Sequence, residues 1–265
     1  MPALFDMELR ALRRDRAARS GPELFLYDRA FNDCLERISL VQRRFERALL
    51  IGCPNAAWPD RLRGFVGQVD VCDPGRRFAN AAEGETVVED AWTPAPGKFD
   101  LVIAIGTLDT INDLPRALMA VHFSMRPGAL LIGAMSGGET LPKLRSAMRA
   151  ADVATGAASP HIHPRIEASA LAPLFAAAGF VDVVVDIDRV QVAYRSFDRL
   201  VGDLRRMAAT NLLVSRVRTP LSKRAVAEAA KCFREAAIDD RTVEVFEILH
   251  FACWTPPQLE APNSD

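Results

Sequence analysis

Four turns of this 265-residue chain carry the side chains best suited to bind a small polar ligand. Each turn follows a short apolar run, as expected after a buried strand, and they span residues 52–56, 73–75, 89–92 and 106–109. In doubly wound sheets, ligands bind beyond the carboxyl ends of the strands. Asp73, after the second run, can therefore hold a ribose diol, and Asp90, after the third, can accept from an adenine amino group. The spacing suits an adenosyl ligand, although acids at strand ends are also ordinary loop residues.

Other reactive side chains carry weaker predictions. His161 and His163 alternate on an extended segment, so both imidazoles could face one way and ligate a metal. No third ligand has a matching spacing, and we predict loop histidines and no metal site. His122 and His250 lie in a helical and a strand pattern and are predicted to be packing or partner residues. Cys53 is either a reactive thiol, if a helix N-terminus lowers its pKa, or a small buried side chain, which we favour.

The elements that position these turns alternate along the chain. Apolar runs occur at residues 48–52, 69–72, 86–88, 99–105, 129–134, 181–187 and 243–253. Between them lie windows with helical spacing of apolar residues, one of which begins with Asn112 or Asp113 as cap and has Pro115 in its first turn. Strands that are apolar on both faces and separated by helices predict an α/β fold with a doubly wound, mostly parallel, seven-stranded sheet.

The segments outside this alternation are predicted to be helical additions. Residues 1–46 are expected to form an N-terminal helical arm at 4–20 and a packing helix at about 26–43. The leucines of the arm are too sparse for an apolar stripe, so its arginines are expected to face solvent. Residues 47–257 form the sheet domain, with a helical insertion at 194–240 that caps the edge of the sheet. Residues 258–265 are a short polar tail.

Longer strings of residues point to a known family. The most specific are Asn-Asp-Leu-Pro-Arg-Ala-Leu at 112–118 and Gly-Ala-Met-x-Gly-Gly-x-Thr-Leu at 133–141. Through these, the chain resembles the class I S-adenosylmethionine-dependent methyltransferases. It resembles most their subgroup that contains the arginine hydroxylase of complex I assembly, and more distantly the malonyl-carrier-protein methyltransferase of biotin synthesis. The resemblance runs from Phe5 to about Trp254 and implies a Rossmann-like class I fold. It also implies S-adenosylmethionine as cofactor, bound by Gly52, Cys53, Asp73, Asp90 and Gly106.

The cofactor loop departs from that family. The subgroup reads Leu-Asp-Leu-Gly-Cys-Gly-x-Gly where residues 49–56 here read Leu-Leu-Ile-Gly-Cys-Pro-Asn-Ala. Glycine tolerates positive φ and a close ligand, whereas Pro54 fixes φ near about −65° and removes an N–H donor. Leu50 removes a carboxylate. Asp70 and Asp73 both resemble the family's ribose acid, and we choose Asp73 because turn residues follow it.

These differences from the family's cofactor loop leave two functions open. In the first, the site has decayed, and the fold serves as a non-catalytic or weakly S-adenosylmethionine-binding partner protein of assembly type. In the second, another loop geometry still holds the cofactor of an active methyltransferase or related hydroxylase with an unknown protein or small-molecule acceptor. We favour the first. The arm and the helical insertion could then bind another protein, and the resemblance suggests a respiratory-chain subunit. Five arginines of the arm favour an acidic partner surface: Arg10, Arg13, Arg14, Arg16 and Arg19. A solvated helical face is the alternative.

Composition excludes several other classes. Lys plus Arg number 33 against 34 for Asp plus Glu, which gives a formal charge of −1 and no broad electrostatic basis for binding nucleic acid or an anionic membrane. The five cysteines are odd in number and scattered, which fits neither a disulfide framework nor a thiolate zinc site and favours the cytoplasm. Apolar runs are too short for a membrane span. The sequence does not set an oligomeric state.

Overall fold

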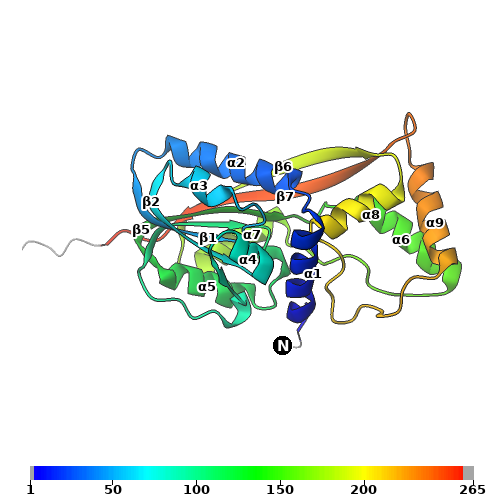
Figure 1. The fold of residues 1–265 in the computed structure, drawn as a ribbon, viewed down its shortest axis with the longest axis horizontal. Coiled ribbons are helices and arrows are strands. Elements are labelled where there is room, and N and C mark those ends of the chain that lie inside the picture. The colour runs from blue at the N-terminus through cyan, green and yellow to red at the C-terminus, as the bar shows by residue number, and fades with distance from the viewer. Residues whose placement is uncertain (1–2, 259–265) are drawn as a thin grey trace, which may run out of the picture.

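A computed structural model describes residues 3–258, which form a mixed seven-stranded sheet flanked by helices (Figure 1). The strands are β1 (Phe45–Ile51), β2 (Val66–Asp73), β3 (Glu85–Thr86), β4 (Phe99–Ile105), β5 (Met125–Ser136), β6 (Val181–Tyr194) and β7 (Thr242–Trp254). Their order is β3-β2-β1-β4-β5-β7-β6. The first five strands are parallel, and β7 runs antiparallel to both β5 and β6. The predicted doubly wound, mostly parallel, Rossmann-like sheet is confirmed.

Successive residues of a strand point to opposite faces of the sheet, so both faces present side chains to be covered. Helices cover both faces. On one face, α2 (Phe25–Leu40) and α3 (Trp58–Leu62) pack over β1 and β4, where the rings of Phe31 and Trp58 stack at 4.4 Å between centroids. On the other face, α5 (Leu114–Ser124) and α7 (Ala168–Ala177) bury Leu118 and Phe175. The predicted start of α5 is confirmed, and of the two candidate caps Asp113 accepts the hydrogen bond from the Arg116 amide, with Pro115 in the first turn.

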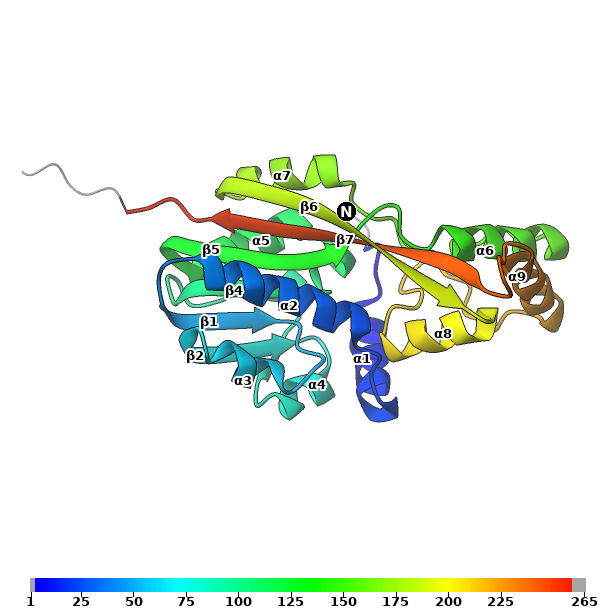
Figure 2. The same cartoon turned by 90° about the horizontal axis from the view of Figure 1, so that it is seen from above.

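A smaller core lies beyond the end of the sheet. There β6 and β7 extend past their neighbours and pack against α6 (Pro142–Thr155), α8 (Phe197–Arg206) and α9 (Lys223–Glu235) (Figure 2). Phe197 meets Phe233 edge to face inside this group. The insertion expected at 194–240 is therefore helical as predicted, but it extends the end of the sheet rather than capping its edge. That part of the prediction was wrong because β6 continues to Tyr194.

Several boundaries differ from the predicted ones. β1 begins at Phe45, two residues before the expected start of the sheet domain at 47, and β3 is a two-residue strand at 85–86 rather than 86–88. Helix α6 was not predicted, since two of its three buried residues are alanines and arginines interrupt its apolar spacing. The polar tail predicted at 258–265 lies, except for Gln258, outside the described residues.

Helix α1 (Met7–Ser20) crosses the end of the sheet near the carboxyl ends of β1 and β2 (Figure 1). It contacts α4 (Arg76–Ala81) on one side and α8 on the other. Arg10, Arg14 and Ala17 form its buried face. The prediction that the arginines of this arm face solvent was wrong for Arg10 and Arg14, because both guanidinium groups find buried carboxylates.

Candidate functional site

Asp73 ends β2 and is the most enclosed acid of the predicted site, with none of its surface exposed. Its carboxylate accepts four hydrogen bonds. Arg14 donates from Nε to Oδ1 at 2.7 Å and from Nη2 to Oδ2 at 2.5 Å. The backbone amide of Cys53 donates to Oδ2 at 2.8 Å, and that of Gly75 donates to Oδ1 at 2.7 Å. Two oxygens that each accept two bonds have their capacity filled.

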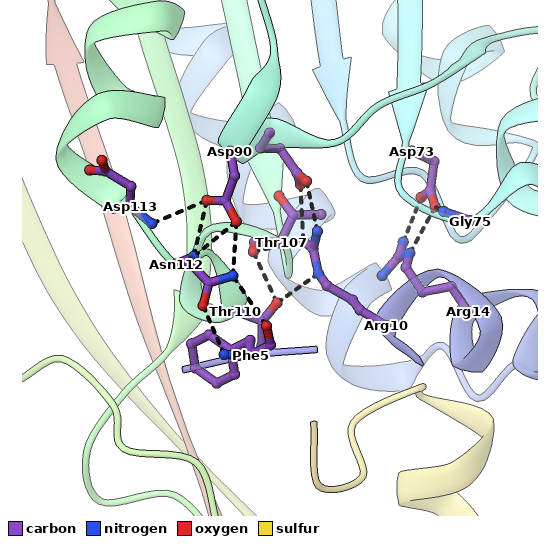
Figure 3. A network of polar contacts seen from close by, with 11 residues as sticks. Phe5, Arg10, Arg14, Asp73, Gly75, Asp90, Thr107, Thr110, Asn112 and Asp113 are labelled. Atoms are coloured by element: carbon purple, nitrogen blue, oxygen red, sulfur yellow. Dashed lines mark hydrogen bonds and ion pairs between the residues drawn. The ribbon is translucent and has the colours of Figure 1, made fainter. Parts of the chain in front are cut away.

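Arg10 makes a second buried pair one turn away on the same face of α1. It donates to both oxygens of Glu89, from Nη1 at 2.6 Å and from Nη2 at 2.9 Å. Its Nε donates to Thr110 Oγ1 and its Nη2 to the Thr107 carbonyl, both at 2.9 Å. Figure 3 shows both guanidinium groups pointing from α1 into the turns that follow the strands. Bidentate pairs of this kind are strong and geometrically specific.

Local sequence explains how α1 reaches these turns. Residues four apart lie on one helix face, so Arg10 and Arg14 point the same way. Asp6 caps the helix by accepting from the Leu9 amide at 3.0 Å. Gly75 allows the close approach, because a Cβ atom there would lie 2.6 Å from the Cβ of Arg14. A side chain at position 75 would therefore push α1 away.

Asp90, the predicted adenine acceptor, is engaged by the protein itself. It accepts from the backbone amide and side-chain amide of Asn112, each at 3.0 Å, and from the Asp113 amide at 3.1 Å. The Asn112 side-chain oxygen accepts in turn from the amides of Leu4 and Phe5, both at 2.8 Å. Figure 3 shows the bond from Phe5. Asp90 thus holds the turn that anchors the chain entering α1. Its role towards a cofactor stays a prediction.

The two predicted glycines lie where only glycine fits. Gly52 has φ +81°, and a Cβ atom there would lie 2.4 Å from the Ile105 carbonyl oxygen. Gly106 has φ +62°, and its Cβ atom would lie 2.4 Å from the ring of Tyr27. The Tyr27 ring thus covers the glycine at the end of β4, on the side where a ligand of this fold would lie.

Cys53 is buried, with 1% of its surface exposed. Burial and, to a lesser degree, the Asp73 carboxylate raise its pKa to about 12. Its Sγ donates to the Asn55 carbonyl oxygen at 3.3 Å. The alternative of a thiol activated by a lowered pKa is therefore contradicted, since the shift has the opposite sign.

The structure separates the two candidates for the ribose acid. Asp70 lies inside β2, three residues before its end, and pairs with Lys98 at 2.6 Å and with Arg47 at 3.0 Å. These partners lower the pKa of Asp70 against the effect of its partial burial. Asp73, the chosen acid, stands at the end of the strand.

The two loop histidines have separate structural partners. The His161 Nε2 lies 2.8 Å from Asp152 Oδ1. His163 Nε2 accepts from the Leu212 amide at 2.7 Å, and burial lowers the pKa of this imidazole to about 4. Within residues 3–258, no group of three His, Cys, Asp or Glu side chains is arranged to hold a metal ion.

Sequence reasoning missed the residues that fill this site. Glu89 stands in the predicted turn beside Asp90, and it is Glu89 that faces Arg10. The packing of the arm against the turns could have been predicted from the spacing of Arg10, Arg14 and Ala17. This spacing places two arginines and a small residue on one helix face. The cavity that remains between the arm and the turns has a volume of about 40 Å³. This volume lies below the range of about 300–1,000 Å³ that small-molecule sites occupy.

Comparison with known proteins agrees with this fold. Residues 24–185 match the family described as methyltransferase domain, which is more than half of the chain. The chain belongs to this family. It is 30% identical over 265 residues to the rat protein named arginine-hydroxylase NDUFAF5, mitochondrial, covering 95% of this chain and 77% of the relative. The human protein of that name is 32% identical over 244 residues, covering 88% of this chain and 70% of the relative.

More distant relatives extend the same family. The malonyl-[acyl-carrier protein] O-methyltransferase of Xylella fastidiosa is 31% identical over 166 residues, 61% of this chain and 54% of that one. Among solved structures, the YcgJ protein of Bacillus subtilis aligns over 86% of this chain and 99% of its own, with TM-score 0.57 and 9% identity. At that identity the likeness shows the fold alone. Within the part of the chain that the structure describes, no helix is both long and apolar enough to cross a membrane.

Proposed function

We propose that this is a methyltransferase-like protein whose adenosyl position is filled by its own arm, and that it acts as a non-catalytic partner protein of assembly type. The observation that carries the proposal is the saturated carboxylate of Asp73. Its two oxygens already accept from Arg14, Cys53 and Gly75. A ribose diol, which is a hydrogen-bond donor to this acid in the fold, would have to displace the guanidinium.

The energy of that displacement favours weak binding. Breaking a buried ion pair costs about 3–5 kcal/mol, because both charges lose their partners in a medium of low dielectric constant. At 1.4 kcal/mol for each factor of ten, this lowers affinity by about 10²–10⁴-fold. A cofactor that binds an open site at about 1 μM would then bind this one at about 0.1–10 mM.

The turn after β1 gives a second, independent reason to expect weak cofactor binding. Leu50 is fully buried in the apolar core, where the subgroup has a carboxylate. Pro54 has no N–H to donate. Tyr27 covers Gly106, with its hydroxyl donating to the Met207 carbonyl at 2.8 Å. The predicted cofactor residues Gly52, Cys53 and Gly106 thus support the fold of the turns, and we propose that S-adenosylmethionine binding is weak or lost.

The partner surface differs from the five arginines expected from the sequence. Arg10 and Arg14 are buried, and Arg13 donates to the Asn211 carbonyl. Arg16 and Arg19 remain exposed on the arm. The insertion adds exposed apolar side chains at Val217 and Leu221. We propose that a protein contacts the surface of the insertion that carries Val217 and Leu221. A respiratory-chain subunit is the candidate. The five free thiols fit a cytoplasmic location.

The test is isothermal titration of the full chain with S-adenosylmethionine and with S-adenosylhomocysteine. The proposal expects a Kd weaker than about 10 μM for both ligands. It also expects Arg14→Gln, which frees the Asp73 carboxylate, to bind at least about tenfold more tightly than the wild type. Arg16→Gln, an exposed arginine on the same helix, is the matched control and should change nothing. A wild-type Kd tighter than about 10 μM would return the protein to the active methyltransferases or related hydroxylases.

A further inference from the structure

Three cavities meet at one buried arginine outside the arm contacts. The largest, about 400 Å³, lies between α6, α8, α9 and the loop before α7. A second of about 100 Å³ lies beyond the ends of β4 and β5, and the third is the residual space of about 40 Å³ under α1. Arg165 lines all three. The first volume falls in the range of about 300–1,000 Å³ that small-molecule sites occupy.

The Arg165 side chain is 6% exposed and has a donor to spare. Its Nη1 donates to Asp109 Oδ2 at 2.9 Å. Its Nε is buried and has no hydrogen-bond partner among residues 3–258. A buried donor without a partner carries a desolvation cost that a bound acceptor would remove. The guanidinium therefore marks the place where the polar group of a ligand would lie.

The charges around the cavities are balanced, which decides the kind of acceptor. Arg165 is paired with Asp109, and Glu247 on the β7 side is paired with Arg189 at 3.0 Å. His163 is uncharged at neutral pH because burial lowers its pKa to about 4. A carboxylate entering here would meet a guanidinium that is already neutralised and would lose its hydration. A neutral carbonyl oxygen accepts the same hydrogen bond without that loss.

The largest of these three cavities is lined mainly by apolar side chains. They come from α6, α8 and the segment before α9: Leu144, Met148, Phe197, Val201, Leu204 and Leu221. Away from Arg165, the wall of this cavity also carries Asp198 and Arg205, which are exposed and opposite in charge. The wall thus suits an apolar chain over most of its length and a single acceptor at Arg165.

We propose that this groove binds a neutral amphiphile, an apolar chain whose ester or amide carbonyl oxygen accepts a hydrogen bond from Arg165. The chain lies between α6, α8 and α9, and the carbonyl points to the junction of the cavities. This site needs no adenosyl ligand and is independent of the proposed function. Its occupant would link α6 and the loop before α7 to the helical insertion, since these segments form the walls of the groove.

The test is isothermal titration of the full chain with octanamide and, as the charged analogue of equal length, octanoate at pH 8. Octanamide is expected to bind at least about fivefold more tightly than octanoate. Arg165→Lys keeps a cation for Asp109 but removes the Nε donor, and it should weaken octanamide binding at least about fivefold. Arg29→Lys alters an exposed pair with Asp188 on the outer side of α2 and is the matched control.

A second variant keeps the test independent of the Arg165–Asp109 pair. Leu144→Trp fills the groove and leaves that pair in place, so it should abolish octanamide binding. Circular dichroism checks that each variant folds. Three results would overturn the proposal: no octanamide binding by the wild type up to about 1 mM, octanoate binding as tightly as octanamide, or unchanged octanamide binding in the folded variants.

Discussion

Arg14 and Asp73 are 59 residues apart in the chain and form a bidentate ion pair with both side chains almost fully buried. Burial opposes the charge of Arg14, but the Asp73 carboxylate prevails and raises the pKa of the guanidinium. The pair joins the arm to the carboxyl end of β2. The acid at the centre of the predicted ligand site is thereby converted into a docking point for the protein's own helix.

Removing Arg14 should destabilise the fold strongly. Arg14→Ala leaves Asp73 buried with two backbone donors and no cation, and we expect the free energy of unfolding to fall by about 3–5 kcal/mol. Arg16→Ala, on the exposed face of the same helix, should stay within about 0.5 kcal/mol of the wild type. Urea unfolding followed by circular dichroism measures both. Equal stabilities of the two variants would mean that the pair does not hold the arm.

The second pair can be tested by replacing both partners. Arg10→Met leaves the Glu89 carboxylate buried without its cation, so we expect a loss of about 3–5 kcal/mol in unfolding free energy. Arg10→Met combined with Glu89→Leu removes both charges and should recover at least about 1 kcal/mol of that loss. Purely additive losses in this double-mutant cycle would show that the two side chains do not interact.

Gly75 tests how closely the arm approaches the turn. Gly75→Ala brings a Cβ atom to 2.6 Å from the Arg14 Cβ, so α1 must shift. We expect a loss of about 1–3 kcal/mol in unfolding free energy from this overpacking. Gly202→Ala is the control, since the structure shows nothing within 4 Å of a Cβ atom at that helical position. That change should stabilise the protein by about 0.5–1 kcal/mol. An unchanged free energy of unfolding in Gly75→Ala would mean that α1 does not pack against the turn.

The acid sensitivity of the protein should depend on His163. Burial lowers the pKa of this imidazole from 6.5 to about 4. The unfolded chain therefore takes up a proton at a pH where the folded chain does not, and stability falls as the pH drops from about 6.5 to about 4. The shift corresponds to about 3 kcal/mol. His163→Gln, whose side-chain oxygen can still accept from the Leu212 amide, should remove that part of the pH dependence. Parallel stability curves for the two proteins would contradict the assignment.

Alkylation of the cysteine thiols tests whether the turn after β1 stays closed in the folded protein. Because the pKa of Cys53 is raised to about 12, only about one thiol in 10⁴ is ionised at pH 8. Iodoacetamide should therefore leave Cys53 unmodified in the folded protein and label the partly exposed Cys232 first. Mass spectrometry of the digested protein identifies the labelled sites. Early labelling of Cys53 would mean that the turn opens readily.

The sheet was predictable because its central strands β1, β4 and β5 are largely buried on both faces and the strands alternate with helices along the chain. The turns followed from the same pattern, so Gly52, Asp73 and Gly106 were placed correctly at strand ends. The contents of the site were not predictable in this way. Arg10 and Arg14 come from a helix whose composition resembles a solvated face, and only the tertiary fold brings them to Glu89 and Asp73.

The direct test of the central claim is the nuclear magnetic resonance signal of the Arg14 Nε–H group, assigned by its loss in Arg14→Gln. A guanidinium held by Asp73 should give a slowly exchanging Nε–H signal that keeps its position when S-adenosylmethionine is added to about 10 μM. The account predicts that result. A signal that exchanges rapidly with water without ligand, or that shifts fully at about 10 μM S-adenosylmethionine, would show that the arm does not occupy the adenosyl position.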